Sequence, residues 1–231
     1  MALILALETS ADICAAALVR DGAVLGARRQ PMTRGHAEAL VPMVQDIAGV
    51  AGISLSDIEI IGVTRGPGSF TGVRTGIAAA RGFALAAGAT AVGVSSLAAI
   101  ACAAAREIAR PTPILCVLDT RRVDYFVQLF DESGDACTPA DVMEAAKIFE
   151  LIGTEGPVLA GNAVPRLLSQ FPGDPGFIRR APGDGQPDPV DVAVIAEAIL
   201  NKEGVASDTL SPLYLRLPEA KLPADGGRLK S

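Results

Sequence analysis

The amino-acid sequence predicts an α/β protein of two lobes, each with a mixed sheet flanked by helices. Apolar, strand-like runs alternate with helix-like segments over the 231 residues, which is typical of the α/β class. Hairpins open each half, and antiparallel hairpins make a sheet mixed rather than purely parallel. The triplets Leu7-Glu8-Thr9 and Leu118-Asp119-Thr120 also repeat 111 residues apart, which favours two related units. We therefore expect lobes at residues 1–110 and 111–231.

The first half starts with three expected strands within residues 3–30, and Asp21-Gly22 supplies the turn between the second and the third. Apolar residues at helical spacing then indicate helices, and short apolar runs indicate buried strands. The remaining expected elements, in order, are a helix over residues 35–51, a strand over 58–65, a helix from about Thr71 to Ala87, a strand over 90–96 and a helix over 97–109.

The second half repeats this opening, with two strands within residues 113–130 and a turn at Ser133-Gly134. Helical and strand patterns continue beyond it, and proline and glycine mark the loops. We expect a helix near 139–152, a strand over 157–161, a helix near 163–170, a loop over 172–189, a helix over 191–204 that stops at Gly204, and a tail over 211–231 whose apolar first part docks.

Composition argues against several classes of protein. The formal net charge is −6 and the four cysteines show no CxxC spacing. Proteins that bind nucleic acid on their own are usually basic, although a cluster of Arg28, Arg29 and Arg34 is compatible with a phosphate contact as well as with a solvated loop. Neither a zinc site nor a disulfide framework is expected, and no apolar run suits a transmembrane helix. We expect a cytoplasmic protein without membrane contact.

His36 is the only histidine, and this limits the available chemistry. A zinc site of the HExxH type needs two imidazoles on one helical face, and a Ser-His-Asp triad would have to use His36. The stretch GVSSL at Gly93 lacks the closing glycine of a GxSxG nucleophile elbow. We expect no catalytic residue and no metal site, with His36 capping a helix or contacting a partner.

The glycine-rich stretch GPGSFTG, residues 66–72, precedes an apolar helix, as many phosphate-binding loops do. The Walker A pattern fails because Val73 rather than Lys follows the closing glycine, and Thr71 stands where the dinucleotide fingerprint needs its third glycine. The backbone amides remain able to hold an anion. We favour a tight turn that lets the helix pack closely.

Two acidic residues, Glu8 and Asp119, end the opening strands of the two halves. If the lobes are related by symmetry, their carboxylates face each other, which suits a metal–phosphate cleft. They also suit ordinary strand-end turns, and both readings stay open. Together with Thr9 and Ser10 they are the only weak candidates for a nucleotide site. We expect no tightly bound cofactor, with ATP or ADP at a subunit junction left open.

The two long helices of the first half carry a surplus of apolar surface. The apolar arc of residues 37–51 covers about 200°, roughly twice what a helix lying on its own core requires. The next helix has a ridge of small residues at Gly72, Gly76, Ala80 and Ala84, which another helix could approach. Surplus apolar surface implies a partner, unless the second half of the chain covers it. The expected interface residues are His36, Ala39, Met43, Ile47, Val50, Arg74, Ile77 and Arg81.

This interface hypothesis makes a prediction for two side chains of the first helix. Glutamate in place of Met43 or Ile47 should leave the fold intact and abolish dimerisation. Unfolding instead would place both side chains in the internal core.

Six stretches carry a resemblance to a known family, and they are LALETSADICAAALVRDG, HAEALVPMV, GPGSFTGVRTGIAAARGFA, GVSSLAAIA, LDTRRVDYFVQLF and SPLYLRLPEA. They span nearly the whole chain, and the most specific part is residues 66–72 with Arg74 and Gly76. Together they resemble the TsaB (YeaZ) family, whose members are non-catalytic subunits of the machinery that makes threonylcarbamoyladenosine at position 37 of certain tRNAs.

The resemblance implies an actin-like, sugar-kinase-like ATPase (ASKHA) fold of two lobes. It implies a scaffold that supports threonylcarbamoyl transfer to N6 of adenosine 37 by forming a heterodimer with the catalytic paralogue TsaD, through the first two helices of each protein. The ATPase TsaE joins that assembly, tRNA is reached only through it, and homodimers form through the same helices when TsaD is absent. Relatives usually carry Asp-Thr-Ser where this chain has Glu8-Thr9-Ser10, which makes intrinsic phosphate chemistry less expected here.

Two other functions compete with this interpretation. A nucleotide-dependent transferase or kinase of the same fold would need ATP between Glu8 and Asp119. A glycoprotease-like peptidase would need a metal or an activated nucleophile, for which a single histidine offers little support.

Overall fold

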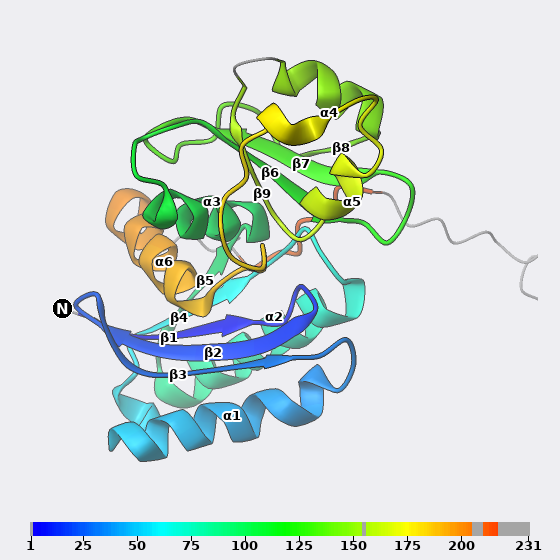
Figure 1. Ribbon diagram of the computed structural model, residues 1–231. Coiled ribbons are helices and arrows are strands. Elements are labelled where there is room, and N and C mark those ends of the chain that lie inside the picture. Colours follow the sequence, from blue (N-terminus) through cyan, green and yellow to red (C-terminus); the bar gives the residue numbers. More distant parts are fainter. Residues whose placement is uncertain (1, 154–155, 205–209, 217–231) are drawn as a thin grey trace, which may run out of the picture.

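The computed structural model describes residues 2–153, 156–204 and 210–216. Two β-sheets are stacked with helices between and outside them, so that the protein has five layers (Figure 1). Helices α1 and α2 cover the outer face of the first sheet, α6 and α3 lie between the sheets, and α4 and α5 cover the outer face of the second. This layering is the predicted α/β class with mixed sheets flanked by helices, and the prediction is confirmed.

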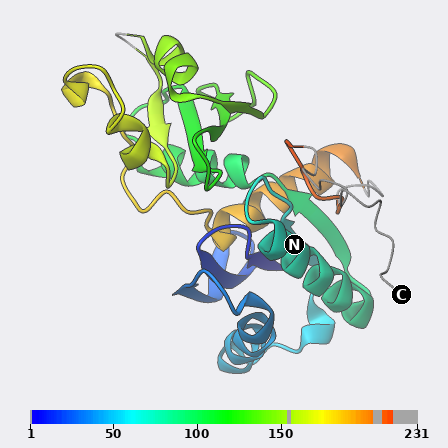
Figure 2. The same ribbon diagram turned by 90° about the vertical axis from the view of Figure 1, so that its right-hand side faces the viewer.

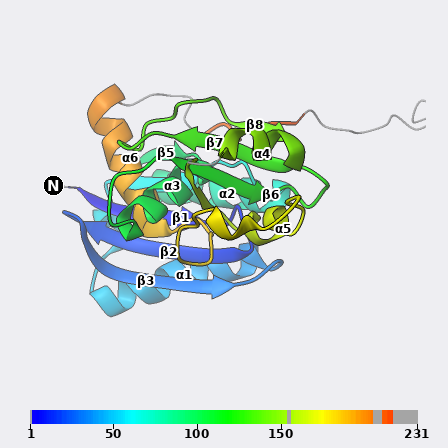
Figure 3. The same cartoon turned by 45° about the horizontal axis from the view of Figure 1, so that its top comes forward.

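The first sheet has the strand order β3-β2-β1-β4-β5, with β3 at the outer edge (Figure 3). Strand β1 pairs antiparallel with β2 and parallel with β4. The predicted hairpin turn between β2 and β3 lies at Asp21 and Gly22, whose φ angles are 55° and 74°, as a two-residue hairpin requires. The strands are Leu3–Glu8 (β1), Ile13–Arg20 (β2), Ala23–Pro31 (β3), Ile60–Thr64 (β4) and Thr90–Val94 (β5).

Strand β1 is buried on both faces, and its side chains alternate between two cores. Leu3, Leu5 and Leu7 pack toward α1 and α2, whereas Ile4 and Ala6 pack toward α6. Figure 2 shows α1 and α2 together on one side of this sheet and α6 on the other. These helices are His36–Ala51 (α1), Phe70–Ala87 (α2) and Pro189–Glu203 (α6), and a 3₁₀ turn, Leu55–Asp57, follows α1.

The second sheet has the order β8-β7-β6-β9. Alternate residues of β6 again face two cores, with Leu115 and Val117 toward α4 and α5 and with Cys116 and Leu118 toward α3. The strands are Ile114–Asp119 (β6), Tyr125–Phe130 (β7), Asp141–Met143 (β8) and Val158–Ala160 (β9), and the helices are Ser96–Glu107 (α3), Ala145–Ile152 (α4) and Val164–Leu168 (α5), with a 3₁₀ turn at Pro175–Phe177.

The two sheets repeat one local topology. Strand β6 pairs antiparallel with β7 and parallel with β9, just as β1 pairs with β2 and β4. The repeated triplets therefore end equivalent strands. The chain does not remain with the second sheet after residue 111, because α6 returns to pack on β1 and β4. The boundary between lobes at residue 110 stays a prediction.

Some predicted elements differ in detail. The helix expected near 139–152 starts only at Ala145, because residues 141–143 form β8 against β7. The expected loop over 172–189 contains a single 3₁₀ turn, and α6 begins at Pro189, one residue after its cap Asp188. Of the tail, the apolar part at 210–216 is described, and the polar part at 217–231 lies outside the described residues.

The prediction that Met43 and Ile47 form an uncovered stripe is wrong. Their exposed fractions are 4% and 5%, and both belong to the core beneath the first sheet. The reason is that α1 packs on both β2 and β3, so the sheet covers a wider arc of the helix than one strand could. Position 26 of β3 is a glycine whose added Cβ would touch Ile47. The cover comes from the first sheet and not from the second half of the chain.

The predicted ridge of small residues on α2 also points inward. Gly72, Gly76 and Ala80 are buried, and a Cβ on either glycine would collide with Thr9. These small residues let α2 approach the end of β1 rather than a partner helix. The solvent-facing side of α2 carries a different set of small residues, Ala78, Gly82 and Ala86.

Candidate functional site

Three loops meet where the strands β1 and β6 end. They are the β1–β2 turn, the turn before α2 and the β6–β7 turn. Between them is a cavity of only about 20 Å³, lined by Ser10, Gly68, Asp119, Asn162 and neighbouring residues. An ion pair between Arg121 and Asp12 links the β6–β7 turn to the β1–β2 turn at 2.5 Å. A cavity of this size holds about one water molecule and is far too small for a nucleotide.

The Glu8 carboxylate accepts hydrogen bonds from the amides of the β1–β2 turn. Its Oε1 atom accepts hydrogen bonds from the Ser10 amide at 2.5 Å, the Ser10 hydroxyl at 2.8 Å and the Ala11 amide at 3.1 Å. Amides arranged in this way form a nest for an anion. The longer side chain of Glu reaches back into the nest of its own turn, so the anion held there belongs to the protein.

Burial disfavours the charged form of Glu8. Its side chain is fully buried, and burial raises its pKa from 4.5 to about 7, although hydrogen bonding to Thr64, Ser10 and Ala11 opposes the shift. The second carboxylate oxygen, Oε2, and the Thr64 hydroxyl are both buried without a partner at normal hydrogen-bond distance. A proton on Oε2 would let the carboxyl group donate to Thr64 and satisfy both atoms.

The glycine-rich loop has the structural role that the sequence favours. The Thr9 hydroxyl donates to the Gly72 carbonyl at 2.8 Å, and the Ser69 amide donates to the Ser10 carbonyl at 2.7 Å. Ser69 also caps α2, since its hydroxyl accepts from the Gly72 amide at 3.3 Å. The loop thus fixes the start of α2 against the β1–β2 turn.

Alanine at Gly72 is expected to destabilise the protein by about 2 kcal/mol, because its Cβ would overlap the Thr9 carbonyl oxygen and force backbone to move. Alanine at Gly82, in the same helix, meets nothing within 4 Å and should stabilise by roughly 0.5–1 kcal/mol. Urea unfolding of both variants measures the difference. Equal stabilities would show that α2 does not need its close approach to β1.

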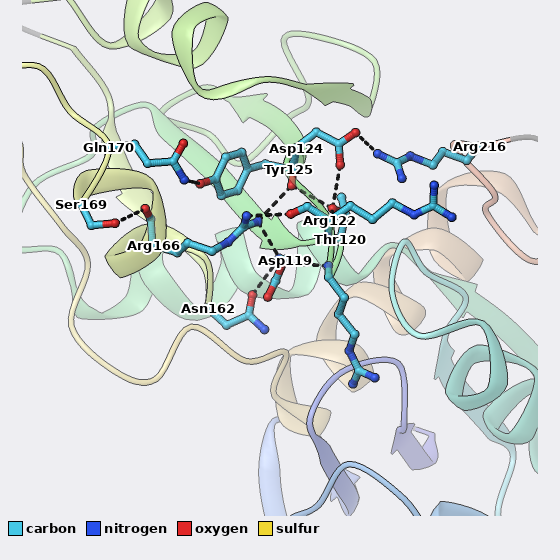
Figure 4. Close-up of polar contacts among 11 residues, drawn as sticks. Asp119, Thr120, Arg122, Asp124, Tyr125, Asn162, Arg166, Ser169, Gln170 and Arg216 are labelled. Carbon is cyan, nitrogen blue, oxygen red and sulfur yellow. Dashed lines mark hydrogen bonds and ion pairs between the residues drawn. The ribbon is translucent and has the colours of Figure 1, made fainter.

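The β6–β7 turn is held in place by an arginine. Arg166 of α5 donates to Asp119 at 2.9 Å and to the backbone carbonyls of Arg122 and Asp124, and its guanidinium lies 4.0 Å from the centre of the Tyr125 ring. Figure 4 shows Arg166 reaching from α5 across to the turn. Asp119 is therefore bound by a cation of the protein itself, at the strand end where the sequence left a metal–phosphate site open.

Further contacts within the β6–β7 turn and with other segments fix its conformation. The Thr120 hydroxyl donates to Asp124, the Asp119 amide donates to the Asn162 side chain at 3.0 Å, and Arg216 pairs with Asp124. These contacts appear in Figure 4. Arg166, Asn162 and Arg216 were not singled out from the sequence, because their partners are distant along the chain.

The predicted nucleotide candidates are thus only partly brought together. Ser10 and Asp119 line the same small cavity. Glu8 and Thr9 are buried and turned toward their own loop and toward α2. Among the described residues, no group of three or more His, Cys, Asp and Glu side chains could hold a metal ion.

The predicted interface residues divide into buried and exposed sets. His36, Met43, Ile47 and Ile77 are buried, with exposed fractions of 8% or less, and Ala39 is half-buried. Val50 is 90% exposed, and Arg74 and Arg81 are exposed as well. The membership of all eight in a partner interface stays a prediction. No helix in the described part of the chain is long and apolar enough to cross a membrane.

The duplicated sheet, with strand-end loops facing one another across a cleft, defines the class of actin-like and sugar-kinase-like ATPase folds. An inorganic polyphosphate/ATP-glucomannokinase from Arthrobacter sp. strain KM superimposes with a TM-score of 0.50 over 86% of this chain and 99% of that chain, at 13% identity, which supports the fold alone. YeaZ from Pseudomonas aeruginosa gives a TM-score of 0.79 over 93% of this chain and 100% of that chain, at 27% identity.

Sequence comparison narrows the class to a family. The model of the family "TsaD: tRNA N6-adenosine threonylcarbamoyltransferase" matches residues 30–173. The tRNA threonylcarbamoyladenosine biosynthesis protein TsaB of Escherichia coli is 36% identical over 161 residues, which cover 70% of this chain and 69% of that protein. The chain belongs to the TsaB (YeaZ) family.

Proposed function

We propose that the chain is a non-catalytic subunit in the biosynthesis of threonylcarbamoyladenosine in tRNA. It docks on a catalytic protein of the TsaD type and supports threonylcarbamoyl transfer to N6 of adenosine 37. Membership of the TsaB family supports the pathway, and the two strand-end loops support the absence of catalysis. The Glu8 carboxylate occupies the β1–β2 turn and Arg166 binds the β6–β7 turn, and the cavity of about 20 Å³ between Ser10 and Asp119 has no room for a nucleotide.

The outer face of α2 supports the docking role, and it is the observation that carries the proposal. Exposed residues Ala78, Gly82, Leu85 and Ala86 lie within one arc of the helix, and Leu85 is 88% exposed. A glycine in mid-helix costs about 1 kcal/mol relative to alanine, and Gly82 has no neighbour within 4 Å that would explain it. A flat face of small residues beside one large apolar side chain suits the close approach of another helix.

The helix α1 also carries exposed apolar residues. Val41 and Val50 are 42% and 90% exposed and lie on the two flanks of the buried arc of α1, and α1 and α2 lie on the same side of the first sheet (Figure 2). Burying a Leu or Val side chain fully contributes about 1.5–3 kcal/mol. Several such residues are needed to offset an association cost of at least about 4 kcal/mol, and the two helices together supply them.

Glutamate at Leu85 should abolish association with the cognate TsaD protein while leaving the fold intact, because a charge would be buried in the interface but is solvated in the free chain. Size-exclusion chromatography of the mixed proteins at micromolar concentration measures association, and circular dichroism measures folding. The matched control is Val24→Glu on β3, a residue that is 49% exposed outside the helical face. It should keep the shared peak.

The proposal fails if the wild-type chain and its TsaD partner elute separately, or if Leu85→Glu elutes with TsaD as the control does. We further propose that a second copy of the chain uses the same face when TsaD is absent. The ATPase TsaE then joins the TsaB–TsaD assembly rather than the isolated chain. Size-exclusion chromatography tests both statements. The first is tested by omitting TsaD and the second by adding TsaE.

A further inference from the structure

A cavity of about 410 Å³ is lined by the start of α2, the β6–β7 turn and the segment 213–216. It adjoins the cavity of about 20 Å³ between the loops, with which it shares Gly68, Ser69, Asp119 and Arg121. Pockets for small molecules start at roughly 300 Å³, so one nucleotide fits. The aromatic residues Phe70, Phe126 and Tyr214 and the arginines Arg121, Arg122 and Arg216 are among its lining residues.

Phe70 and Tyr214 form an aromatic platform on one wall. Their ring centres are 5.5 Å apart and their planes differ by 24°. The rings are half-exposed, at 54% and 44%, which is unusual for stacked aromatics that serve only the core. The pair comes from segments far apart in sequence, and the Leu213 amide fixes the second segment by donating to the Arg65 carbonyl at 2.7 Å.

Arg74 contacts both rings of this platform. Its guanidinium lies 3.8 Å from the centre of the Phe70 ring, and its Nε donates to the Tyr214 hydroxyl at 2.8 Å. Arg74 is not among the residues that line the cavity, whereas both rings are. The contacts with Arg74 fix the orientation of both rings beside the cavity, so binding of a ligand there costs little entropy for ordering the rings.

Three arginines also line the cavity. Arg121, Arg122 and Arg216 line the cavity together with a single acid, Asp119, which is already paired with Arg166. Figure 4 shows the side chains of Arg122 and Arg216 close to the β6–β7 turn. Arg121 and Arg216 also have acidic partners, Asp12 and Asp124.

We propose that this cavity binds one nucleotide of a single-stranded RNA segment, with the base stacked beside Phe70 and Tyr214 and the phosphate facing the arginines of the β6–β7 turn. Aromatic platforms beside basic side chains are how proteins bind unpaired bases. The proposal rests on the proposed function, because tRNA is the substrate of that assembly. It adds a direct contact of this chain with RNA, which the negative net charge of the chain does not suggest.

Binding of a labelled short single-stranded oligoribonucleotide tests the proposal by fluorescence anisotropy, with the chain alone and with its complex with TsaD. Replacing Phe70 by Leu keeps an apolar side chain but removes the ring, and it should weaken binding about 5- to 100-fold. Phe177→Leu is the matched control, because Phe177 is 51% exposed in the other half of the molecule. Arg122→Gln should lower the dependence of binding on salt concentration. Thermal unfolding checks that each variant is folded.

Several outcomes overturn the proposal. These are no binding by the wild-type chain or its complex, equal binding by Phe70→Leu and Phe177→Leu, or AMP binding as tightly as the oligonucleotide. Loss of TsaE association by Phe70→Leu with unchanged RNA binding would make the cavity a protein-docking site instead. Failure of the proposed function is a different result, since it appears as absence of the TsaD peak, which Phe70→Leu should retain.

Discussion

Glutamate at Ile47 is expected to unfold the protein or leave it barely stable. Ile47 is 5% exposed and packs beneath the first sheet with Met43 and Val44. Losing the buried isoleucine costs about 2–3 kcal/mol, and burying a carboxyl group without a partner adds more. The sum of about 4 kcal/mol or more is a large share of the roughly 5–15 kcal/mol by which a domain is stable.

The matched control is Val50→Glu, one turn further along the same helix. Val50 is 90% exposed, so its replacement should change the free energy of unfolding by less than about 0.5 kcal/mol. Urea titration followed by circular dichroism measures both variants. A folded Ile47→Glu protein with the stability of Val50→Glu would mean that α1 presents Ile47 to solvent after all.

This prediction reverses the one drawn from the sequence, and the reversal has a physical cause. A helical wheel gives the width of an apolar arc but not the width of the surface that covers it. Here β2 and β3 both contact α1, and Gly26 leaves room for Ile47 between them. The excess apolar surface that remains, at Val41 and Val50, is smaller and flanks the buried arc on its two sides.

Local rules served better where the interaction is local. The hairpin at Asp21-Gly22 and the cap at Ser69 depend on residues next to each other in the chain. The short repeat at Glu8 and Asp119 also predicted equivalent strand ends, because the strands that precede them have the same apolar pattern. Pattern alone could not show that α6 crosses back to the first sheet, since its apolar residues suit either sheet.

The contacts of Glu8 and Arg166 with the strand-end loops could not be predicted from the sequence, for a different reason. Arg166 is 47 residues from Asp119, and no spacing rule connects an arginine on a short helix with a turn so distant. At Glu8 the unusual residue was visible in the sequence, but its direction was not. The carboxylate does not face the second lobe. It turns back onto the Ser10 and Ala11 amides.

Replacing Glu8 with glutamine is expected to stabilise the protein at neutral and alkaline pH. The pKa of Glu8 is about 7 in the folded protein and 4.5 without the fold, so between these values the folded state binds a proton that the unfolded state has lost. The contribution of Glu8 to stability is therefore fully present below pH 4.5 and is lost as pH rises through 7. At pH values above the folded pKa the loss reaches about 3 kcal/mol.

Glutamine keeps the shape of the side chain and does not titrate. Its oxygen can accept from the Ser10 and Ala11 amides as Oε1 does, and its NH₂ group can donate to the Thr64 hydroxyl, which lacks a partner. Glu8→Gln should thus match wild type at acidic pH and exceed it by up to about 3 kcal/mol at alkaline pH. The exposed Glu132, changed to Gln, is the control and should leave the pH dependence unaltered. Parallel curves of unfolding free energy against pH for wild type and Glu8→Gln would mean that Glu8 is ionised in the fold at little cost, so that its carboxylate is better solvated than its burial implies.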